Sequence, residues 1–126
     1  MLLSGPAGSG KSDLLLRLID RGFDLVADDR VDLDGLLARP APALAGMLEV
    51  RGLGILRLPY VPEARLALVV EMARDVARLP CPARHAALDL PLLRLDPAPA
   101  SAPMRVALAL DCVLGRVAQL AGAFVP

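Results

Sequence analysis

The chain has 126 residues, 56% of them apolar and 22% charged, a balance that indicates a folded protein and excludes a disordered one. Its formal net charge is zero, so it offers no general attraction for nucleic acid or for an anionic membrane surface. With one Tyr, two Phe and no Trp it lacks aromatic side chains for stacking bases, and its length fits a single domain over residues 1–126.

The first predicted elements are a strand, a helix and a second strand. Residues 1–4 are mostly apolar and typical of the end of a buried strand. Residues 12–21 repeat leucine and isoleucine at helical spacing and stop at Gly22, so they predict an amphipathic helix. Residues 25–27 predict a short strand that ends in the pair Asp28–Asp29.

The middle of the chain predicts further strands. Residues 31–39 predict a hairpin that turns at Asp34–Gly35. Residues 48–58 predict one strand that is bent or bulged at its two glycines, and residues 66–72 predict a buried strand. We therefore expect an α/β protein in which strands outnumber helices.

The last third of the chain predicts two short strands, a loop and a helix. The strands are expected at residues 84–90 and 92–95, on either side of a proline. Residues 96–103 are a proline-rich loop. Residues 104–121 carry apolar side chains at helical spacing and predict a helix that starts at residue 101 or 102.

The cysteines and the single histidine form no catalytic or metal-binding pattern. Cys81 and Cys112 lack metal-ligand spacing, so we expect reduced thiols, with Cys112 in the core, as in a cytoplasmic protein. An isolated histidine usually carries no role, and we interpret His85 as a surface or strand residue. No apolar run is long enough to span a membrane and no signal peptide is recognisable, so we expect no membrane partner.

The stretch GPAGSGKS matches the phosphate-binding loop pattern G-x-x-x-x-G-K-[ST] in full, between a predicted strand and a predicted helix. Its glycines let backbone N–H groups point at phosphate oxygens, and the helix start adds positive charge. Lys11, the only lysine, would reach the β and γ phosphates, and the Ser12 hydroxyl would bind Mg²⁺. The alternative is a Gly-Ser turn that only caps a helix. The residues expected to hold the phosphates are Gly5, Pro6, Ala7, Gly8, Ser9, Gly10, Lys11 and Ser12.

Asp28 and Asp29 are adjacent carboxylates seventeen and eighteen residues after Lys11. Neighbouring side chains at a strand end point different ways, so one carboxylate can face the phosphate site while the other holds a neighbour. The one that faces the γ-phosphate can accept the proton of an attacking hydroxyl. The alternative is a solvated acidic turn paired with Arg30. A GTPase is excluded, because the chain has no asparagine for the base-reading motif.

The stretch LEVRGLGI carries Glu49 and Arg51 two residues apart, so a strand would direct both side chains to one face. Glu49 could complete a Mg²⁺ shell with Ser12, and Arg51 could bind a phosphoryl oxygen. The alternative is an ion pair on a solvated face of the sheet.

Taken together, GPAGSGKSDLLLRLIDRG, LVADDRVDL, AGMLEVRGLGI and LPLLRLDPAPASAP resemble the HPr kinase/phosphorylase family. The resemblance is to the catalytic domain, in the short form found in alphaproteobacteria, and covers nearly the whole chain. It implies a phosphate-binding loop on a mixed sheet with few helices, like that of phosphoenolpyruvate carboxykinase. It also implies a catalytic domain that continues upstream of Met1, where the family has a catalytic histidine.

The resemblance implies an ATP-dependent kinase that phosphorylates a serine of HPr, a carrier protein of the sugar phosphotransferase system. The same enzymes run phosphorolysis, in which inorganic phosphate attacks phosphoserine and pyrophosphate leaves. Carried over by position, Lys11 would be catalytic, and Ser12 and Glu49 would bind Mg²⁺. Asp29, or failing that Asp28, would be the base for the serine hydroxyl and the acid in reverse.

The resemblance also implies a homo-oligomer, a hexamer in full-length members. Residues 48–56, which contain Arg51, would act in both directions, and residues 96–103 would lie where the family has its dephosphorylation segment. Two alternatives stay open: a kinase of another protein or of a small hydroxylated metabolite, and a non-catalytic module that binds nucleotide or pyrophosphate.

Overall fold

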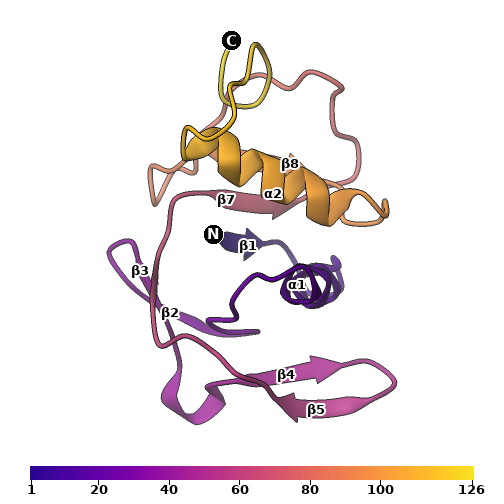
Figure 1. The fold of residues 1–126 in the computed structure, drawn as a ribbon, viewed down its shortest axis with the longest axis vertical. Helices are drawn as coiled ribbons and strands as arrows, with labels where there is room; N and C mark the ends of the chain where they lie inside the picture. Colours follow the sequence, from indigo (N-terminus) through magenta and orange to yellow (C-terminus); the bar gives the residue numbers. More distant parts are fainter. The chain divides into compact units, whose positions relative to one another are not determined.

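The structure, a computed structural model, describes residues 1–126 as two compact units. The first unit contains residues 1–11 and 67–126, and the second contains residues 12–66. The second unit is therefore an insertion in the chain of the first. Figure 1 shows both units, with most of their helices and strands labelled.

The first unit is built on a parallel sheet of three strands, β1 (Leu2–Ser4), β7 (Val69–Met72) and β8 (Leu92–Leu95), in the order β1-β7-β8. The central strand β7 is apolar and its Val69 and Val70 side chains are fully buried, as expected for a strand of a parallel sheet. All three strands end at the same edge, and the glycine-rich loop leaves β1 there.

Helix α2 (Ala102–Val113) follows the proline-rich loop and lies over β8 in Figure 1. It buries one stripe of side chains, among them Val106, and leaves Met104 and Leu108 about half exposed. The start of the helix confirms the sequence prediction, but its end at Val113 does not, because Gly115 adopts φ 77°. The Gly115 and Arg116 N–H groups donate to the carbonyls of Cys112 and Asp111, the pattern of a Schellman C-cap.

The second unit contains helix α1 (Lys11–Asp20), whose first residue belongs to the first unit, and two small antiparallel sheets. Leu14 and Leu18, four residues apart, are buried on one face of α1. The remaining elements of this unit are β2 (Val31–Asp34), β3 (Leu37–Pro40), the 3₁₀ turn η1 (Pro42–Leu44), β4 (Met47–Val50), β5 (Gly54–Arg57) and β6 (Ala64–Arg65).

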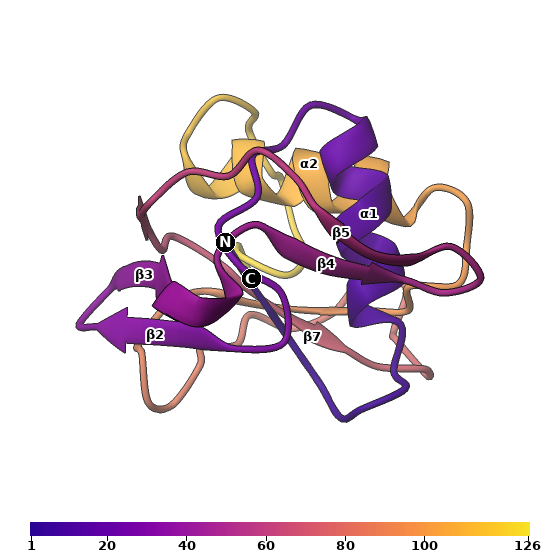
Figure 2. The ribbon, with the colours of Figure 1, turned by 90° about the horizontal axis from the view of Figure 1, so that it is seen from below.

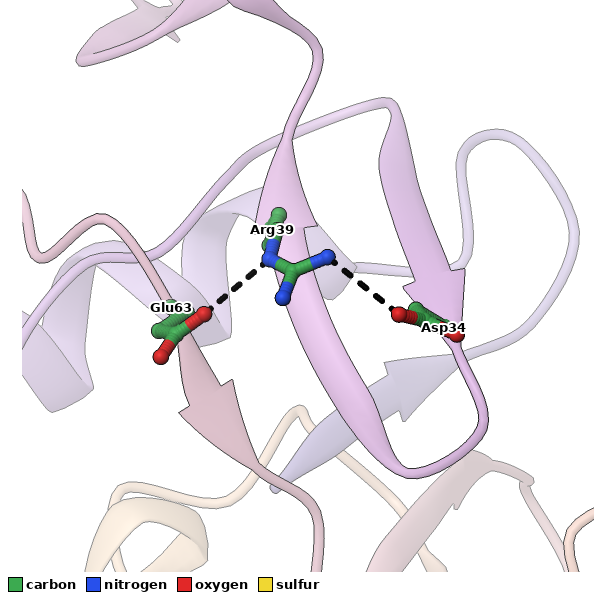
Figure 3. Close-up of polar contacts among 3 residues, drawn as sticks. All are labelled: Asp34, Arg39 and Glu63. Carbon is green, nitrogen blue, oxygen red and sulfur yellow. Dashed lines mark hydrogen bonds and ion pairs between the residues drawn. The ribbon is translucent and has the colours of Figure 1, made fainter.

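Arg39 on β3 bridges two carboxylates of the second unit (Figure 3). Its Nε lies 3.0 Å from Glu63 Oε2, and its Nη1 lies 3.5 Å from Asp34 Oδ2. The hydrogen bond and the charge of Glu63 raise the pKa of Arg39 above its ordinary value. The group is exposed, so we assign this contact a structural role in joining the β2–β3 hairpin to the segment before β6.

Three predicted elements are wrong. Residues 25–27 form no strand, although Leu25 is buried, because its carbonyl accepts one hydrogen bond from Val61 and no ladder follows. Residues 48–58 are not one bent strand but the hairpin β4–β5, whose strands run side by side in Figure 2. Residues 84–90 contain only an isolated bridge from Arg84 to Pro91.

The β2–β3 hairpin, the first helix and the strand at residues 92–95 confirm the sequence predictions. The strand predicted at residues 66–72 is present but shorter, as β7. Parallel and antiparallel strands with two α-helices make a mixed α/β fold, as expected. Both cysteines are free, Cys81 exposed and Cys112 partly buried. No helix has the length and apolar character needed to cross a bilayer.

Candidate phosphate-binding site

The loop between β1 and α1 needs glycine at both of its ends. Gly5, Gly8 and Gly10 all have positive φ, at 150°, 77° and 95°. A Cβ on Gly5 would lie 2.9 Å from Ser9 Oγ and 3.0 Å from Met72 Cβ, and one on Gly10 would lie 2.9 Å from Pro97 Cγ. The missing side chains of Gly5 and Gly10 therefore let residues at the ends of β7 and β8 pack closely against the loop backbone.

Two side chains of this loop have unusual environments. The Lys11 Nζ donates a 2.5 Å hydrogen bond back to the carbonyl of Gly5, so the lysine lies across the loop that precedes it. The Ser9 Oγ is buried and has no hydrogen-bond partner. An unpaired buried hydroxyl costs about 1–3 kcal/mol. The loop thus keeps an ammonium group and a spare hydroxyl among its backbone amides.

In the second unit, the Ser12 Oγ donates a 2.9 Å hydrogen bond to Asp28 Oδ1. Both residues are partly buried, and they are sixteen positions apart in the chain. Ser12 stands in the first turn of α1, where backbone N–H groups have no partner within the helix. The arrangement fixes the serine hydroxyl with its lone pairs available for a cation.

Asp29 differs from Asp28 in backbone conformation, exposure and contacts. Its backbone adopts φ 54°, one of two non-glycine residues with positive φ, and its side chain is exposed. It makes no hydrogen bond or ion pair, and Arg30 pairs with Asp32 at 3.2 Å instead. Of the two readings of this acidic pair, a turn neutralised by Arg30 is therefore wrong.

The positions of Glu49 and Arg51 correct the sequence analysis. Glu49 lies on β4 opposite Ile55, whereas Arg51 lies in the turn that joins β4 to β5. The two therefore do not share one face of a strand. Both side chains are exposed, and neither makes a hydrogen bond or ion pair with Ser12 or Asp28.

The residues present fit a magnesium ion that is bound together with phosphate groups. No three His, Cys, Asp or Glu side chains gather into a site of their own. Mg²⁺ in nucleotide sites usually takes one or two protein oxygens and completes its shell with water and phosphate oxygens. The Ser12 hydroxyl held by Asp28 supplies that kind of donor.

Sequence reasoning missed the residues that shape this loop from other strands. Met72 and Pro97 follow from the parallel register, because the ends of β7 and β8 meet the loop at one edge of the sheet. A signal was present in the two apolar runs that precede them. His85, predicted to be a surface or strand residue, is half-buried and outside any strand, and its Nδ1 accepts the Leu88 N–H at 3.1 Å.

A parallel strand, a glycine-rich loop and a helix that begins with lysine and serine are typical of α/β proteins that bind phosphate groups. The family model of the HPr serine kinase C-terminal domain matches residues 1–74. The chain therefore belongs to the HPr serine kinase C-terminal domain family.

Curated relatives agree with this family. HPr kinase/phosphorylase of Clostridium novyi is 52% identical over 63 residues, which are 47% of this chain and 20% of that protein. The Neisseria meningitidis serogroup C protein of the same name is 40% identical over 84 residues, 57% of this chain and 26% of the relative. The Burkholderia cenocepacia protein is 41% identical over 96 residues, which are 64% of this chain and 30% of that protein. The chain thus spans 20–30% of the length of these relatives.

A solved structure shares the fold. The Hpr(Ser) kinase/phosphatase from Coxiella burnetii superposes with a TM-score of 0.76 at 24% identity, covering 90% of this chain and 82% of that one. The predicted fold class, an α/β phosphate-loop fold with few helices like that of HPr kinase, is confirmed.

Proposed function

We propose that this chain carries the catalytic centre of an ATP-dependent protein-serine kinase that acts on HPr and also dephosphorylates it by phosphorolysis. One observation carries the proposal: the Ser12 hydroxyl, directly after the glycine-rich loop, is held by Asp28 at 2.9 Å. A helix-capping turn alone would not need a carboxylate sixteen residues away. The family and its curated relatives support the choice of HPr as acceptor.

The binding roles follow the loop. The loop of residues 5–12 holds the β and γ phosphates through its backbone N–H groups, which every residue except Pro6 has. The Lys11 ammonium neutralises charge on the oxygens between them. Lys11 leaves the Gly5 carbonyl when phosphate replaces it as acceptor. Ser12 and Glu49 would hold Mg²⁺, which would supply further positive charge at the phosphates.

In the forward reaction the HPr serine oxygen bonds to the γ-phosphorus while the bond from that phosphorus to the ADP oxygen breaks. Asp29 accepts the serine proton, a role that suits an exposed carboxylate with no partner. Asp28 is engaged with Ser12 and serves as its positioning residue. Arg51 binds an oxygen of the transferred phosphoryl group.

In the reverse reaction an oxygen of inorganic phosphate bonds to the phosphoserine phosphorus, and the bond to the serine oxygen breaks. The serine oxygen takes a proton from Asp29, and pyrophosphate leaves. The forward direction consumes ATP and the reverse direction consumes inorganic phosphate, two reactants of the cytoplasm, where we propose that the protein works. We further propose that it acts as a homo-oligomer, as a hexamer when full-length.

The test is phosphoryl transfer from labelled ATP to purified HPr with Mg²⁺, with phosphoserine identified by mass spectrometry. We expect transfer by the wild-type chain, its loss in Asp29→Asn, and its retention in Asp24→Asn, a nearby exposed carboxylate without an ion pair. Nucleotide bound without transfer to any acceptor would instead favour a binding module, and transfer only to a metabolite would favour a small-molecule kinase.

A further inference from the structure

Three polar residues form a row across the parallel sheet of the first unit. Ser4 on β1 pairs in register with Glu71 on β7, and Glu71 pairs with Arg94 on β8. Residues paired side by side direct their side chains to the same face. Because Ser4 is the last residue of β1, the row lies one position before the phosphate-binding loop.

Glu71 holds the arginine on the β7 side of β8. Arg94 Nε lies 3.6 Å from Glu71 Oε1, so the guanidinium leans from β8 toward β7, which is the side of β1. One strand spacing, about 4.8 Å, then remains to the strand that carries the loop. Glu71 is the single partner of Arg94, so no other contact holds the guanidinium away from β1.

The arginine keeps most of its donors free. Its side chain is 62% exposed, and the N–H groups of its two Nη atoms have no partner in the protein. The segment that follows Arg94 also reaches the loop, because Pro97 packs against Gly10. A planar, permanently charged donor group at this edge matches the geometry of phosphate oxygens.

We infer that Arg94 is a second cationic ligand, beside Lys11, for the phosphate chain in the loop, and that Glu71 is its positioning residue. The inference rests on the proposed function. A carboxylate close to phosphate normally weakens phosphate binding by charge repulsion. Glu71 would instead strengthen phosphate binding, because it holds the Arg94 guanidinium in place.

Pyrophosphate binding to the 126-residue chain, measured by calorimetry, tests the inference without any phosphoryl transfer. We expect Arg94→Gln to weaken binding roughly tenfold or more and Arg94→Lys to weaken it less. Glu71→Gln should weaken binding in the wild-type background but not in the Arg94→Gln background. Binding that tightens in Glu71→Gln alone, or that is unchanged in Arg94→Gln, would overturn the inference.

A matched ion pair at the C-terminal end of α2, between Asp111 on the helix and Arg116 just after it, serves as control. Arg116 Nη1 lies 3.4 Å from Asp111 Oδ1, with side-chain exposures of 67% and 37% against 62% and 40% for Arg94 and Glu71. Arg116→Gln and Asp111→Asn should leave pyrophosphate affinity unchanged. The variant Lys11→Met distinguishes a failure of the proposed function from a failure of the role of Arg94. If it leaves binding intact, the loop is not a phosphate site and the proposed function fails, whereas loss in Lys11→Met with no effect of Arg94→Gln refutes only the role of Arg94.

Discussion

Gly8 and Gly10 stand two positions apart in the same loop, but they are glycines for different reasons. Both have positive φ, which disfavours any side chain. A Cβ on Gly8 would have open space around it, whereas one on Gly10 would lie 2.9 Å from Pro97 Cγ. Only Gly10 therefore couples the loop to the chain that leaves β8.

Gly10→Ala should accordingly destabilise the protein by about 2–4 kcal/mol, since strain at positive φ adds to overpacking against Pro97. Gly8→Ala should cost about 1 kcal/mol from backbone strain alone. Thermal unfolding measures the difference, at roughly 3–5 °C per kcal/mol for a chain of this size. Adding Pro97→Ala to Gly10→Ala should restore part of the loss, and equal melting temperatures for the two glycine variants would contradict the contact.

Asp28 makes a second prediction at the scale of a single residue. Asp28→Asn can still accept the Ser12 hydrogen bond but loses its charge, so we expect the affinity for Mg²⁺ in the presence of pyrophosphate to fall about tenfold or more. Asp13→Asn, an exposed carboxylate paired with Arg17 at 3.0 Å in the first turn of α1, is the control and should change little. A magnesium dependence equal in the two variants would exclude Asp28 from the metal site.

At the scale of elements, α2 shows how burial and exposure are divided along one helix. Val106 is fully buried, while Leu108, two positions later, is 46% exposed. The sequence spacing places both in one apolar helix, but only packing separates their contributions. The cost of removing side-chain atoms is high where a cavity is left and low where water takes their place.

Val106→Ala should therefore lower the free energy of unfolding by about 2 kcal/mol, whereas Leu108→Ala should change it by less than about 0.5 kcal/mol. Chemical denaturation followed by circular dichroism gives both values. Comparable losses in the two variants would mean that α2 does not pack on the face that the structure buries.

The elements that sequence reasoning found are those fixed by local chemistry. The glycine-rich loop, the leucines of α1 and the Asp34–Gly35 turn each define a structure without reference to distant residues. The prediction from Gly52 and Gly54 was wrong, because glycines with positive φ occur in bulged strands and in hairpin turns alike. Leu25 is buried as in a strand, but a strand also needs a partner, which spacing does not reveal.

The candidate site divides in the same way. The loop follows from its motif, whereas the Ser12–Asp28 hydrogen bond and the row of Ser4, Glu71 and Arg94 depend on contacts between distant residues. Register decides which side chains meet, and a single sequence does not contain it.

At the scale of the whole molecule, the proposed ligands belong to both units. Residues 5–11 are part of the first unit, and Ser12, Asp28 and Glu49 are part of the second. The boundary falls on the peptide bond between Lys11 and Ser12, which are consecutive in the loop motif. We therefore expect a separate response to ligand in the motif residues of each unit.

Hydrogen exchange measured by mass spectrometry tests this. We expect ATP with Mg²⁺ to slow exchange in residues 5–11 and also around Asp28, because bound ligand suppresses local opening. ATP with a chelator should protect residues 5–11 more than the Asp28 segment. Lys11→Met should abolish both effects, and protection near Asp28 that is independent of Mg²⁺ would contradict the proposed metal ligands.

The left-handed backbone of Asp29 has a consequence for anyone who evolves this protein for heat resistance. A residue at φ 54° forgoes the conformations that an L-amino acid prefers, and glycine would relieve that conflict at no steric cost. A selection for thermal stability that does not also measure enzyme activity should therefore enrich Asp29→Gly and remove the proposed proton acceptor. The more stable variants from such a selection would have no phosphoryl-transfer activity.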